Sequence, residues 1–403
     1  MTTDRPIPDT LVRRSPWPEG VSRPLGSPIQ PSVVFISESP DQLDDQYGGA
    51  VEGYTYSREG HPNADVLARK IDALEGAPEA GGGGLIVGSG MAAVSAVLMG
   101  LLRAGDHVLG GSQLYGRSLR LMREDLPRFG ITASLADPTD TESFARAITP
   151  QTRLILVELV SNPILRVADI EGIARLARDR GILLAIDATF STPRAFRPFD
   201  YGADIVIHSV TKLLSGHSDV TLGYVATRDP AHRKAIYDFA VTTGLTPSPF
   251  DCWLAERGLM TFHLRYDRAE ENARALADHL ATLPGLRRVV YPLRPDHPDH
   301  NRAVAILGKR GGNMVSFELM GGRNAANTLV RAMPNLAFAP TLGDIGTTLS
   351  HPASTSHRGM TPEQRAANGL SEGFFRVSVG VEDIELLKQE FTAGIAAATG
   401  ISD

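Results

Sequence analysis

Apolar and polar positions alternate with two periods along the middle of the chain. Between about residues 64 and 250, short apolar runs are separated by segments whose apolar positions recur at helical spacing. This alternation predicts a mainly parallel sheet with helices on both faces, an α/β architecture. The predicted strands are GLIV (84–87), HVLGG (107–111), RLILVEL (153–159), ILLAID (182–187) and DIVIHS (204–209), and the predicted helices include residues 64–76, 91–105, 118–130 and 170–181.

The two ends of the chain differ from the middle in composition and periodicity. Residues 1–60 are rich in Pro, Gly and Ser and lack sustained periodicity, which predicts an extended arm, either disordered or held on another surface. A long helical segment, from about Phe250 to Leu283, leads into mixed strands and helices. That mixture predicts a smaller α+β domain at the C-terminus. The predicted organisation is therefore an arm (1–60), an α/β domain (61–260) and a C-terminal domain (261–403).

Composition fits a globular enzyme. The 403 residues are 42% apolar and 21% charged, enough to bury the cores of two domains. The net charge of −6 gives no reason to expect a nucleic-acid or membrane partner. The N-terminus has no apolar core of signal-peptide length, and the longest apolar stretch, Met91 to Leu102, is too short to span a bilayer. A single cysteine, Cys252, excludes an internal disulfide and fits a reducing, cytoplasmic location.

Three features fall at the carboxyl ends of predicted strands, where ligands bind in open α/β sheets. The first is VGSGMAA, residues 87–93, between a strand and a helix. Backbone N–H groups at this helix start, at Ser89, Gly90 and Met91, could hold a phosphate. Two alternatives remain open: a glycine turn that only packs helix on strand, or a dinucleotide fingerprint, with Asp106 following 18 residues after its first glycine.

The second feature is Asp187, which closes the strand ILLAI. A carboxylate at the end of a buried strand is costly unless it is paired. A protonated pyridine nitrogen is a suitable partner, because that ion pair makes a cofactor ring a strong electron sink. The alternative is that Asp187 caps the start of a following helix.

The third feature is HSVTKLLSGHSD, residues 208–219, directly after the strand DIVI. Lys212 lies where the sheet ends, and Ser209 and Thr211 offer hydroxyls that could bind phosphate. A partly desolvated lysine has a lowered pKa and can form a Schiff base. Most lysines are merely solvated, but the three features together indicate a site for pyridoxal 5′-phosphate.

The sequence also resembles the trans-sulfuration (Cys/Met metabolism) family of pyridoxal-phosphate enzymes, which includes cystathionine γ-synthases, cystathionine γ-lyases, methionine γ-lyases and O-acylhomoserine sulfhydrylases. The resemblance covers about residues 53–382 and implies the fold-type I, aminotransferase-like architecture. The motifs that carry it are YTYSREGHPN (54–63), GSGMAA (88–93), YGRS (115–118), SNP (161–163), IDATFSTP (186–193), HSVTKLLSGHSD (208–219), PFDCWLAERGLMT (249–261), HPASTSH (351–357) and FRVSVGVED (375–383).

The resemblance implies roles for particular residues. Lys212 corresponds to the Schiff-base lysine, Asp187 to the partner of the pyridine nitrogen, and Tyr115 to a tyrosine that stacks on the ring and moves protons. Arg376 corresponds to the arginine that grips the substrate carboxylate. The implied phosphate cradle comprises Ser89, Gly90, Met91, Ser209 and Thr211. Tyr56 and Arg58 are implied to reach the phosphate of a neighbouring subunit, in a homotetramer of dimers with shared active sites. Asn162, Thr341 and Arg117 are further candidates for substrate binding.

Departures from the family pattern bear on the substrate. Arg117 stands where methionine γ-lyases carry a reactive cysteine, and Pro340 where cystathionine-handling members often have glutamate. Other departures are His61-Pro62-Asn63, Ala188 and Leu213. They favour a γ-replacement or γ-elimination on a sulfur amino acid or an O-acylhomoserine, of sulfhydrylase or γ-lyase type. The alternatives are a cystathionine γ-synthase or a cystathionine or cysteine β- or γ-lyase.

Two further classes stay open on the sequence alone. A nicotinamide-dependent oxidoreductase would use Gly88 to Ala93 but leaves Lys212, Asp187 and Arg376 unexplained. A non-catalytic binding protein of the same fold would need an inert Lys212. No metal site is expected. The histidines that could suggest one are assigned to surface loops: His297, His300, His351 and His357. Cys252 is predicted to be a buried, unreactive thiol.

Overall fold

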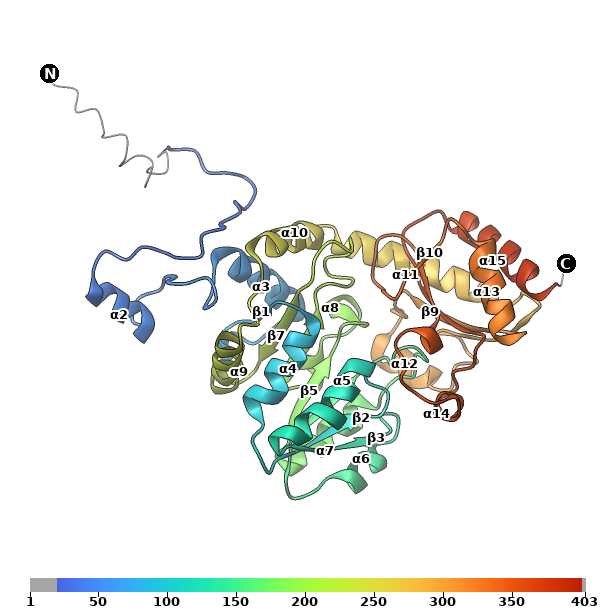
Figure 1. The fold of residues 1–403 in the computed structure, drawn as a ribbon, viewed down its shortest axis with the longest axis horizontal. Helices are drawn as coiled ribbons and strands as arrows, with labels where there is room; N and C mark the ends of the chain where they lie inside the picture. The colour runs from blue at the N-terminus through green and yellow to red at the C-terminus, as the bar shows by residue number, and fades with distance from the viewer. Residues whose placement is uncertain (1–19, 401–403) are drawn as a thin grey trace.

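The structure is a computed structural model that describes residues 20–400, and its elements form two sheets with their helices (Figure 1). The first sheet is built from residues 85–227 and the second from residues 286–378. Part of the predicted arm, residues 1–19, lies outside the described residues. The boundary proposed near residue 260 stays a prediction.

The first sheet has seven strands in the order β1-β7-β6-β5-β4-β2-β3. All neighbours from β6 to β3 are parallel, whereas β7 and β1 are added antiparallel at one edge. This confirms the mainly parallel sheet, and each of the five predicted strands is present. The bounds are β1 Leu85–Val87, β2 His107–Gly111, β3 Thr132–Ala136, β4 Thr152–Glu158, β5 Leu183–Asp187, β6 Ile205–Ser209 and β7 Gly223–Thr227.

Helices cover both faces of this sheet, which explains why its central strands are almost wholly apolar. On β6, Val206 packs into the core on one face and Ile207 into the core on the other. One face is covered by α3 (Pro62–Glu75), α6 (Thr141–Ala147), α7 (Ile170–Arg180) and α10 (Pro249–Leu259). The other is covered by α4 (Gly90–Leu101), α5 (Gly116–Arg120) and α9 (Pro230–Thr243).

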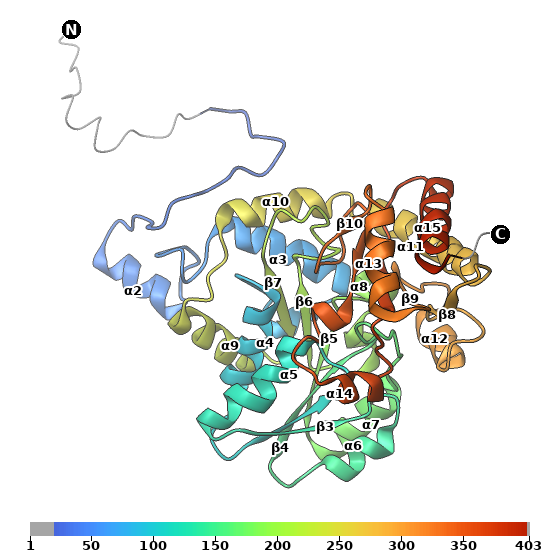
Figure 2. The same ribbon diagram turned by 45° about the vertical axis from the view of Figure 1, so that its right-hand side comes forward.

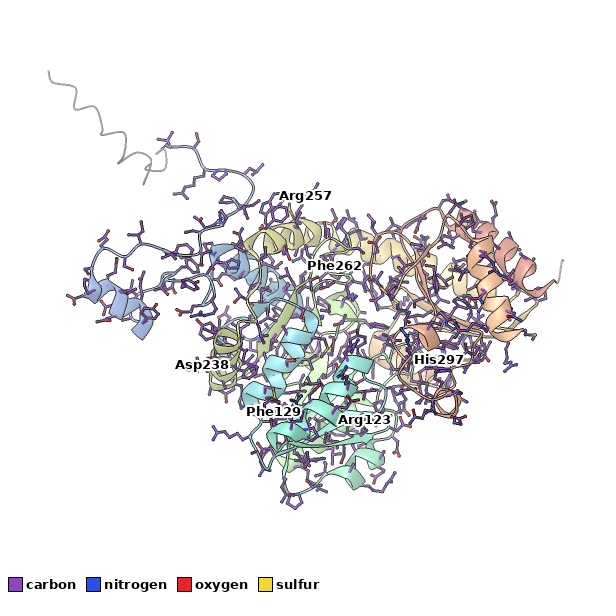
Figure 3. All side chains as sticks on the ribbon, viewed as in Figure 1. Arg123, Phe129, Asp238, Arg257, Phe262 and His297 are labelled. Atoms are coloured by element: carbon purple, nitrogen blue, oxygen red, sulfur yellow. The ribbon has the colours of Figure 1, made fainter. Side chains whose placement is uncertain are left out.

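Two predicted helices are interrupted. The helix expected over 118–130 begins as α5 but continues as a π-helical turn (Leu121–Asp125) and a 3₁₀ turn that contains Pro127. The long helical segment after Phe250 consists of α10 and α11 (Phe262–Leu280). Phe262 marks the start of α11, which runs from the α/β part towards the second sheet (Figure 3).

The second sheet has five strands in the order β10-β11-β12-β9-β8, antiparallel except for β10 and β11. Helices α11, α13 and α15 pack on it around a separate apolar core. The smaller α+β C-terminal part is thereby confirmed. Bounds are β8 Leu286–Val290, α12 His300–Leu307, β9 Met314–Leu319, α13 Gly322–Ala332, β10 Ala337–Phe338, β11 Thr348–Ser350, α14 Pro362–Ala367, β12 Phe374–Ser378 and α15 Ile384–Thr399.

The described part of the arm extends away from both sheets (Figure 2). It contains one helix, α2 (Pro40–Gly48), none of whose residues is buried. A bridge between Val34 and Tyr56 joins two parts of the arm to each other. Among residues 20–400, no helix has both the length and the apolar character needed to cross a membrane.

Candidate functional site

One large cavity lies at the carboxyl ends of the parallel strands and also reaches residues of the C-terminal part. Its volume is about 1420 Å³. It brings together most of the residues singled out from the sequence, from segments far apart in the chain. Those that line it are Ser89, Gly90, Met91, Tyr115, Arg117, Asn162, Asp187, Ser209, Thr211, Lys212, Pro340, Thr341 and Arg376. Tyr56 and Arg58 do not line the cavity of their own chain.

The N-terminus of α4 forms one wall of the cavity. Ser89 is its N-cap, and the Ser89 hydroxyl accepts the Ala92 N–H at 3.0 Å. A Cβ on Gly90 would lie 2.6 Å from the Ser209 Cβ, so glycine is needed for this close approach to β6. Backbone N–H groups at a helix start attract anions. The Thr211 hydroxyl, by contrast, already bonds the backbone of Leu222.

The same glycines do not form a dinucleotide site. That fingerprint belongs to a strand in a parallel βαβ unit, whereas β1 is an antiparallel edge strand. Asp106, expected to hold a ribose, precedes β2 and so lies at the opposite end of the strands from the cavity. Its carboxylate instead accepts the Arg103 N–H. The dinucleotide alternative therefore has no structural support.

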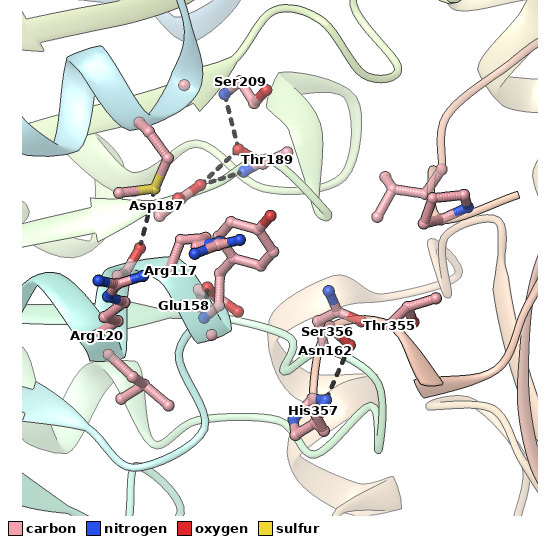
Figure 4. Close-up of a pocket in the computed structure, with 18 of the residues that line it drawn as sticks. Arg117, Arg120, Glu158, Asn162, Asp187, Thr189, Ser209, Thr355, Ser356 and His357 are labelled. Atoms are coloured by element: carbon pink, nitrogen blue, oxygen red, sulfur yellow. Dashed lines mark hydrogen bonds between the residues drawn. The ribbon is translucent and has the colours of Figure 1, made fainter. Parts of the chain in front are cut away.

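Asp187 is the last residue of β5 and faces the cavity. Its Oδ1 accepts the N–H of Thr189 at 3.0 Å and the Thr189 hydroxyl at 2.5 Å, and that hydroxyl accepts the Ser209 N–H at 2.8 Å (Figure 4). Burial raises the pKa of Asp187 despite these bonds, which act in the opposite direction. The nearby helix α8 (Thr192–Ala195) begins after Ser191, so Asp187 is not its N-cap. A cationic partner would stabilise the ionised form of this partly buried acid.

Lys212 follows β6 and extends its amine into the cavity. The Nζ atom lies 3.5 Å from the Thr341 hydroxyl. The pKa of Lys212 is lowered, first by burial and second by the nearby positive charge of Arg376. The amine therefore loses its proton more readily than an exposed lysine, which is what a nucleophile or a proton acceptor requires.

Arg376 reaches the cavity from β12 of the C-terminal sheet. Its Nη1 donates to Asn162 Oδ1 at 2.8 Å, and its Nη2 donates to the Thr341 carbonyl at 2.6 Å. The Nε atom is buried and has no hydrogen-bond partner among the described residues. Burial lowers the pKa of this guanidinium to about 10, so the group is still a cation at neutral pH. A buried cation with a free donor is suited to binding a carboxylate.

Some cavity residues were not singled out from the sequence, among them Glu158, Thr189 and Arg358. Thr189 belongs to a loop and its link between Asp187 and Ser209 depends on the folded geometry. Glu158 closes an apolar strand, as Asp187 does, and that shared position was a usable sequence signal. Arg358 arrives from the C-terminal loop 351–360, which no local pattern connects with the sheet.

The assignment of the histidines to surface loops was wrong for three of them. His297, His351 and His357 are buried, at 6%, 2% and 9% exposure. His297 Nε2 lies 3.0 Å from the Leu165 carbonyl, and His351 lies between Ser354 and Glu372. Their rings take part in packing and hydrogen bonding. Their polar neighbours in the sequence did not indicate this burial. Within residues 20–400, no three His, Cys, Asp or Glu side chains cluster as a metal site would require.

His357 gives a prediction for stability. Burial, and secondarily Arg376, lower its pKa from 6.5 to about 4. Between about pH 4 and 6.5 the unfolded chain therefore binds more protons, and the free energy of unfolding decreases as the pH falls through this window. We expect His357→Asn to reduce the difference in unfolding free energy between about pH 7 and about pH 4.5, by about 2–3 kcal/mol.

The measurement is urea unfolding at the two pH values. His232→Asn is the matched control, because His232 is only partly buried on α9. An unchanged pH dependence in His357→Asn would show that His357 does not lose its charge on folding.

Comparison with known proteins identifies relatives that match nearly the whole of this chain. The family model described as "Cys/Met metabolism PLP-dependent enzyme" matches residues 11–396. Cystathionine beta-lyase of Bacillus subtilis is 38% identical over 384 residues, covering 95% of both chains. O-succinylhomoserine sulfhydrylase of Pseudomonas aeruginosa is 38% identical over 390 residues, covering 96% of this chain and 95% of the relative.

A solved structure agrees with these matches. Cystathionine gamma synthase from Xanthomonas oryzae pv. oryzae, crystallised with aminoacrylate and cysteine, superposes with a TM-score of 0.87. It is 36% identical in sequence, and the match covers 93% of this chain and 94% of that one. The names of these similar proteins thus describe different reactions.

Proposed function

The chain belongs to the family of Cys/Met metabolism enzymes that depend on pyridoxal 5′-phosphate. On that premise, we propose that it catalyses replacement or elimination at the γ-carbon of a sulfur amino acid or an O-acylhomoserine. The observation that carries the proposal is one cavity shared by a partly buried amine on Lys212, a partly buried carboxyl group on Asp187 and a buried guanidinium on Arg376.

The residues present fit the cofactor. Asp187 is a partly buried acid whose ionised form a cation would stabilise, and a protonated ring nitrogen would supply that cation. The start of α4, where Gly90 leaves no room for a side chain beside Ser209, would hold the phosphate. Lys212 would hold the aldehyde carbon through its Nζ. When bound, the cofactor supplies an electron sink for negative charge at the substrate α-carbon.

Other steps of the reaction, substrate binding and proton transfer, would be carried out by side chains of the cavity. Arg376, positioned by Asn162 and the Thr341 carbonyl, would bind the substrate carboxylate and fix the direction of the chain. Lys212, whose amine is deprotonated more easily than usual, would accept and return protons at the α- and β-carbons. Tyr115, which also lines the cavity, would assist departure of the group on the γ-carbon.

We favour an O-acylhomoserine with a negatively charged acyl group. Three arginines of the cavity wall, Arg117, Arg123 and Arg358, form no ion pair with any described residue. Arg120, on the same wall, is paired with Glu124. A relative of this chain is named for O-succinylhomoserine, whose succinyl group ends in a carboxylate. Free guanidinium groups around the cavity would favour such a leaving group over a neutral one.

A substrate panel tests this proposal. O-succinylhomoserine, O-acetylhomoserine, methionine, cystathionine and cysteine are compared with and without added sulfide, and thiol, thioether and 2-oxo acid products are measured. We expect sulfide-dependent replacement on O-succinylhomoserine, preferred over the acetyl ester by about 10-fold or more in kcat/KM. Arg117→Ala is expected to narrow that preference. Release of 2-oxo acid from methionine or cystathionine as the main activity would instead identify a lyase.

We also propose that the active site is shared between subunits of a homotetramer built from dimers. Tyr56 and Arg58 lie on the exposed arm, with the Arg58 guanidinium 5.1 Å from the centre of the Tyr56 ring, and neither reaches the cavity of its own chain. The arm carries exposed apolar side chains, including Val33, Val34 and Ile36, which favour contact with another surface. If the arm places Tyr56 and Arg58 in the cavity of a neighbouring subunit, both observations are explained.

Mixed subunits give a prediction for this arrangement. Lys212→Ala and Arg58→Ala are each expected to be almost inactive. Refolded together in equal amounts, they should recover about a quarter of wild-type activity, because half of the dimers are mixed and each mixed dimer has one intact site. No recovery, with dimers of both variants present by light scattering, would show that Arg58 acts in its own subunit.

We also propose a cytoplasmic location, from the single cysteine. Cys252 is fully buried on α10, as the sequence predicted, and burial raises the pKa of its thiol. A thiol of this kind is unreactive. The chain therefore neither forms an internal disulfide nor needs an oxidising compartment.

A further inference from the structure

The cavity contains a second carboxyl group for which the proposed reaction has no use. Glu158 is the last residue of β4 and pairs in register with Asp187, the last residue of β5. Paired residues on neighbouring parallel strands point to the same face of a sheet. Leu156 and Ala185, two residues earlier on the same strands, both pack into the core beside α4. Both acids accordingly line the cavity from adjacent positions.

Glu158 makes one contact that reaches the candidate catalytic machinery. Its Oε1 accepts the backbone N–H of Tyr115 at 2.7 Å. Tyr115 is the N-cap of α5, and its side chain makes no capping hydrogen bond there. The carboxyl group of Glu158, which lies 43 residues further along the chain, thus holds the backbone at the residue where α5 begins.

The segment that follows Tyr115 is held from the other side as well. A Cβ on Gly116 would lie 2.7 Å from the Ser356 carbonyl oxygen. The loop containing Ser356 and His357 therefore packs directly on the backbone next to Tyr115. Between Glu158 on one side and this loop on the other, the start of α5 has little freedom to shift.

The charge of Glu158 follows from its neighbours. Burial, and then the carboxylate of Asp187, raise the pKa of Glu158 well above its usual range, and the Tyr115 N–H only partly opposes this. Two adjacent, partly buried carboxyl groups do not both ionise readily. Asp187 would face a cation, which favours ionisation of Asp187 and the protonated form of Glu158.

We propose that Glu158 is a positioning residue that holds the Tyr115 backbone, and thereby the phenol ring, through an uncharged carboxyl group beside Asp187. The inference rests on the proposed function, in which Tyr115 acts on the substrate. It predicts that kcat depends on a hydrogen-bond-accepting oxygen in the side chain of residue 158 and does not depend on a negative charge there.

Four variants of the full-length holoenzyme test the proposal: Glu158→Gln, Glu158→Ala, Tyr115→Phe and the double variant Glu158→Ala/Tyr115→Phe. Glu158→Gln keeps an acceptor oxygen without charge, so we expect kcat within about 3-fold of wild type. Glu158→Ala should lower kcat by about 10- to 100-fold with KM changed by less than about 3-fold. The double variant should lose little beyond Tyr115→Phe, because Glu158 acts through Tyr115.

A second readout does not depend on turnover. The visible circular dichroism of the bound cofactor reports how the ring is held, and we expect it to change in Glu158→Ala but not in Glu158→Gln. Glu171→Ala, which removes an exposed glutamate from α7, is the matched control and should leave both readouts unchanged. Melting temperatures separate loss of folding from loss of positioning.

Two results would overturn the inference. Equal losses in Glu158→Gln and Glu158→Ala would mean that an ionised carboxylate is required. Losses that multiply in the double variant would mean that Glu158 acts independently of Tyr115. Failure of the proposed function is distinguishable, because the wild-type protein itself would then lack cofactor dichroism and γ-directed activity.

Discussion

Replacing Lys212 with alanine is expected to lower kcat by about 10⁴-fold or more and to abolish covalent attachment of the cofactor. The loss combines two functions, since the same amine would hold the cofactor and transfer protons in each turnover. Its lowered pKa, caused by burial and by Arg376, suits both tasks. The measurement is steady-state turnover of the best substrate of the panel, together with the visible absorbance of the dialysed protein.

The control for this substitution is Lys234→Ala. Lys234 is an exposed residue of α9 that pairs with Asp238, outside the cavity. It should retain full activity. If Lys212→Ala kept more than a hundredth of wild-type kcat, the assignment of Lys212 as the catalytic lysine would be wrong.

Replacing Asp187 with asparagine is expected to lower kcat by about 10²- to 10³-fold. Asparagine keeps an oxygen that can accept both hydrogen bonds from Thr189, so the substitution removes the charge and little else. Loss of one partner of a buried ion pair costs about 3–5 kcal/mol, and the lower part of that range corresponds to this loss of turnover. Turnover should fall while the variant still binds the cofactor through Lys212.

Asp204 supplies the matched control for Asp187. Its carboxylate accepts the Leu184 N–H at 2.8 Å, at the end of β5 and β6 opposite the cavity. Asp204→Asn should leave kcat within about 3-fold of wild type. Equal effects of the two substitutions would indicate that Asp187 stabilises the sheet rather than the cofactor ring.

The sequence was most informative where chemistry follows directly on a strand. Each of the segments around Ser89, Asp187 and Lys212 adjoins an apolar run, and strand ends of a parallel sheet meet at one edge. Their convergence on one cavity could therefore be predicted without coordinates. The same periodicity predicts five of the seven strands of the first sheet, whereas β3 and β7 were not predicted from it.

Residues that reach the cavity from the second sheet could not be placed in this way. Arg376 lies in the middle of β12, and Thr341 lies in a segment without regular structure. No local pattern shows that either approaches Lys212, because their approach depends on how the two sheets pack. In the sequence, only the resemblance to a family indicates these two residues.

One alternative interpretation and one wrong assignment depended on neighbours in space that the sequence does not show. Gly88 and Gly90 match a dinucleotide fingerprint by spacing, but β1 runs antiparallel at the edge of the sheet. His351 and His357 lie among polar residues in the sequence, yet tertiary packing buries them. Polar character in sequence reports composition, whereas burial reports which other segments fold over a residue.

Peptide mapping of the protein after borohydride reduction tests the central claim most directly. Borohydride converts the bond between the cofactor aldehyde carbon and a lysine amine into one that survives proteolysis, so mass spectrometry can locate it. The account predicts a single pyridoxyl group, attached at Lys212. Recovery of the label on another lysine, or no incorporation after incubation with pyridoxal 5′-phosphate, would contradict it.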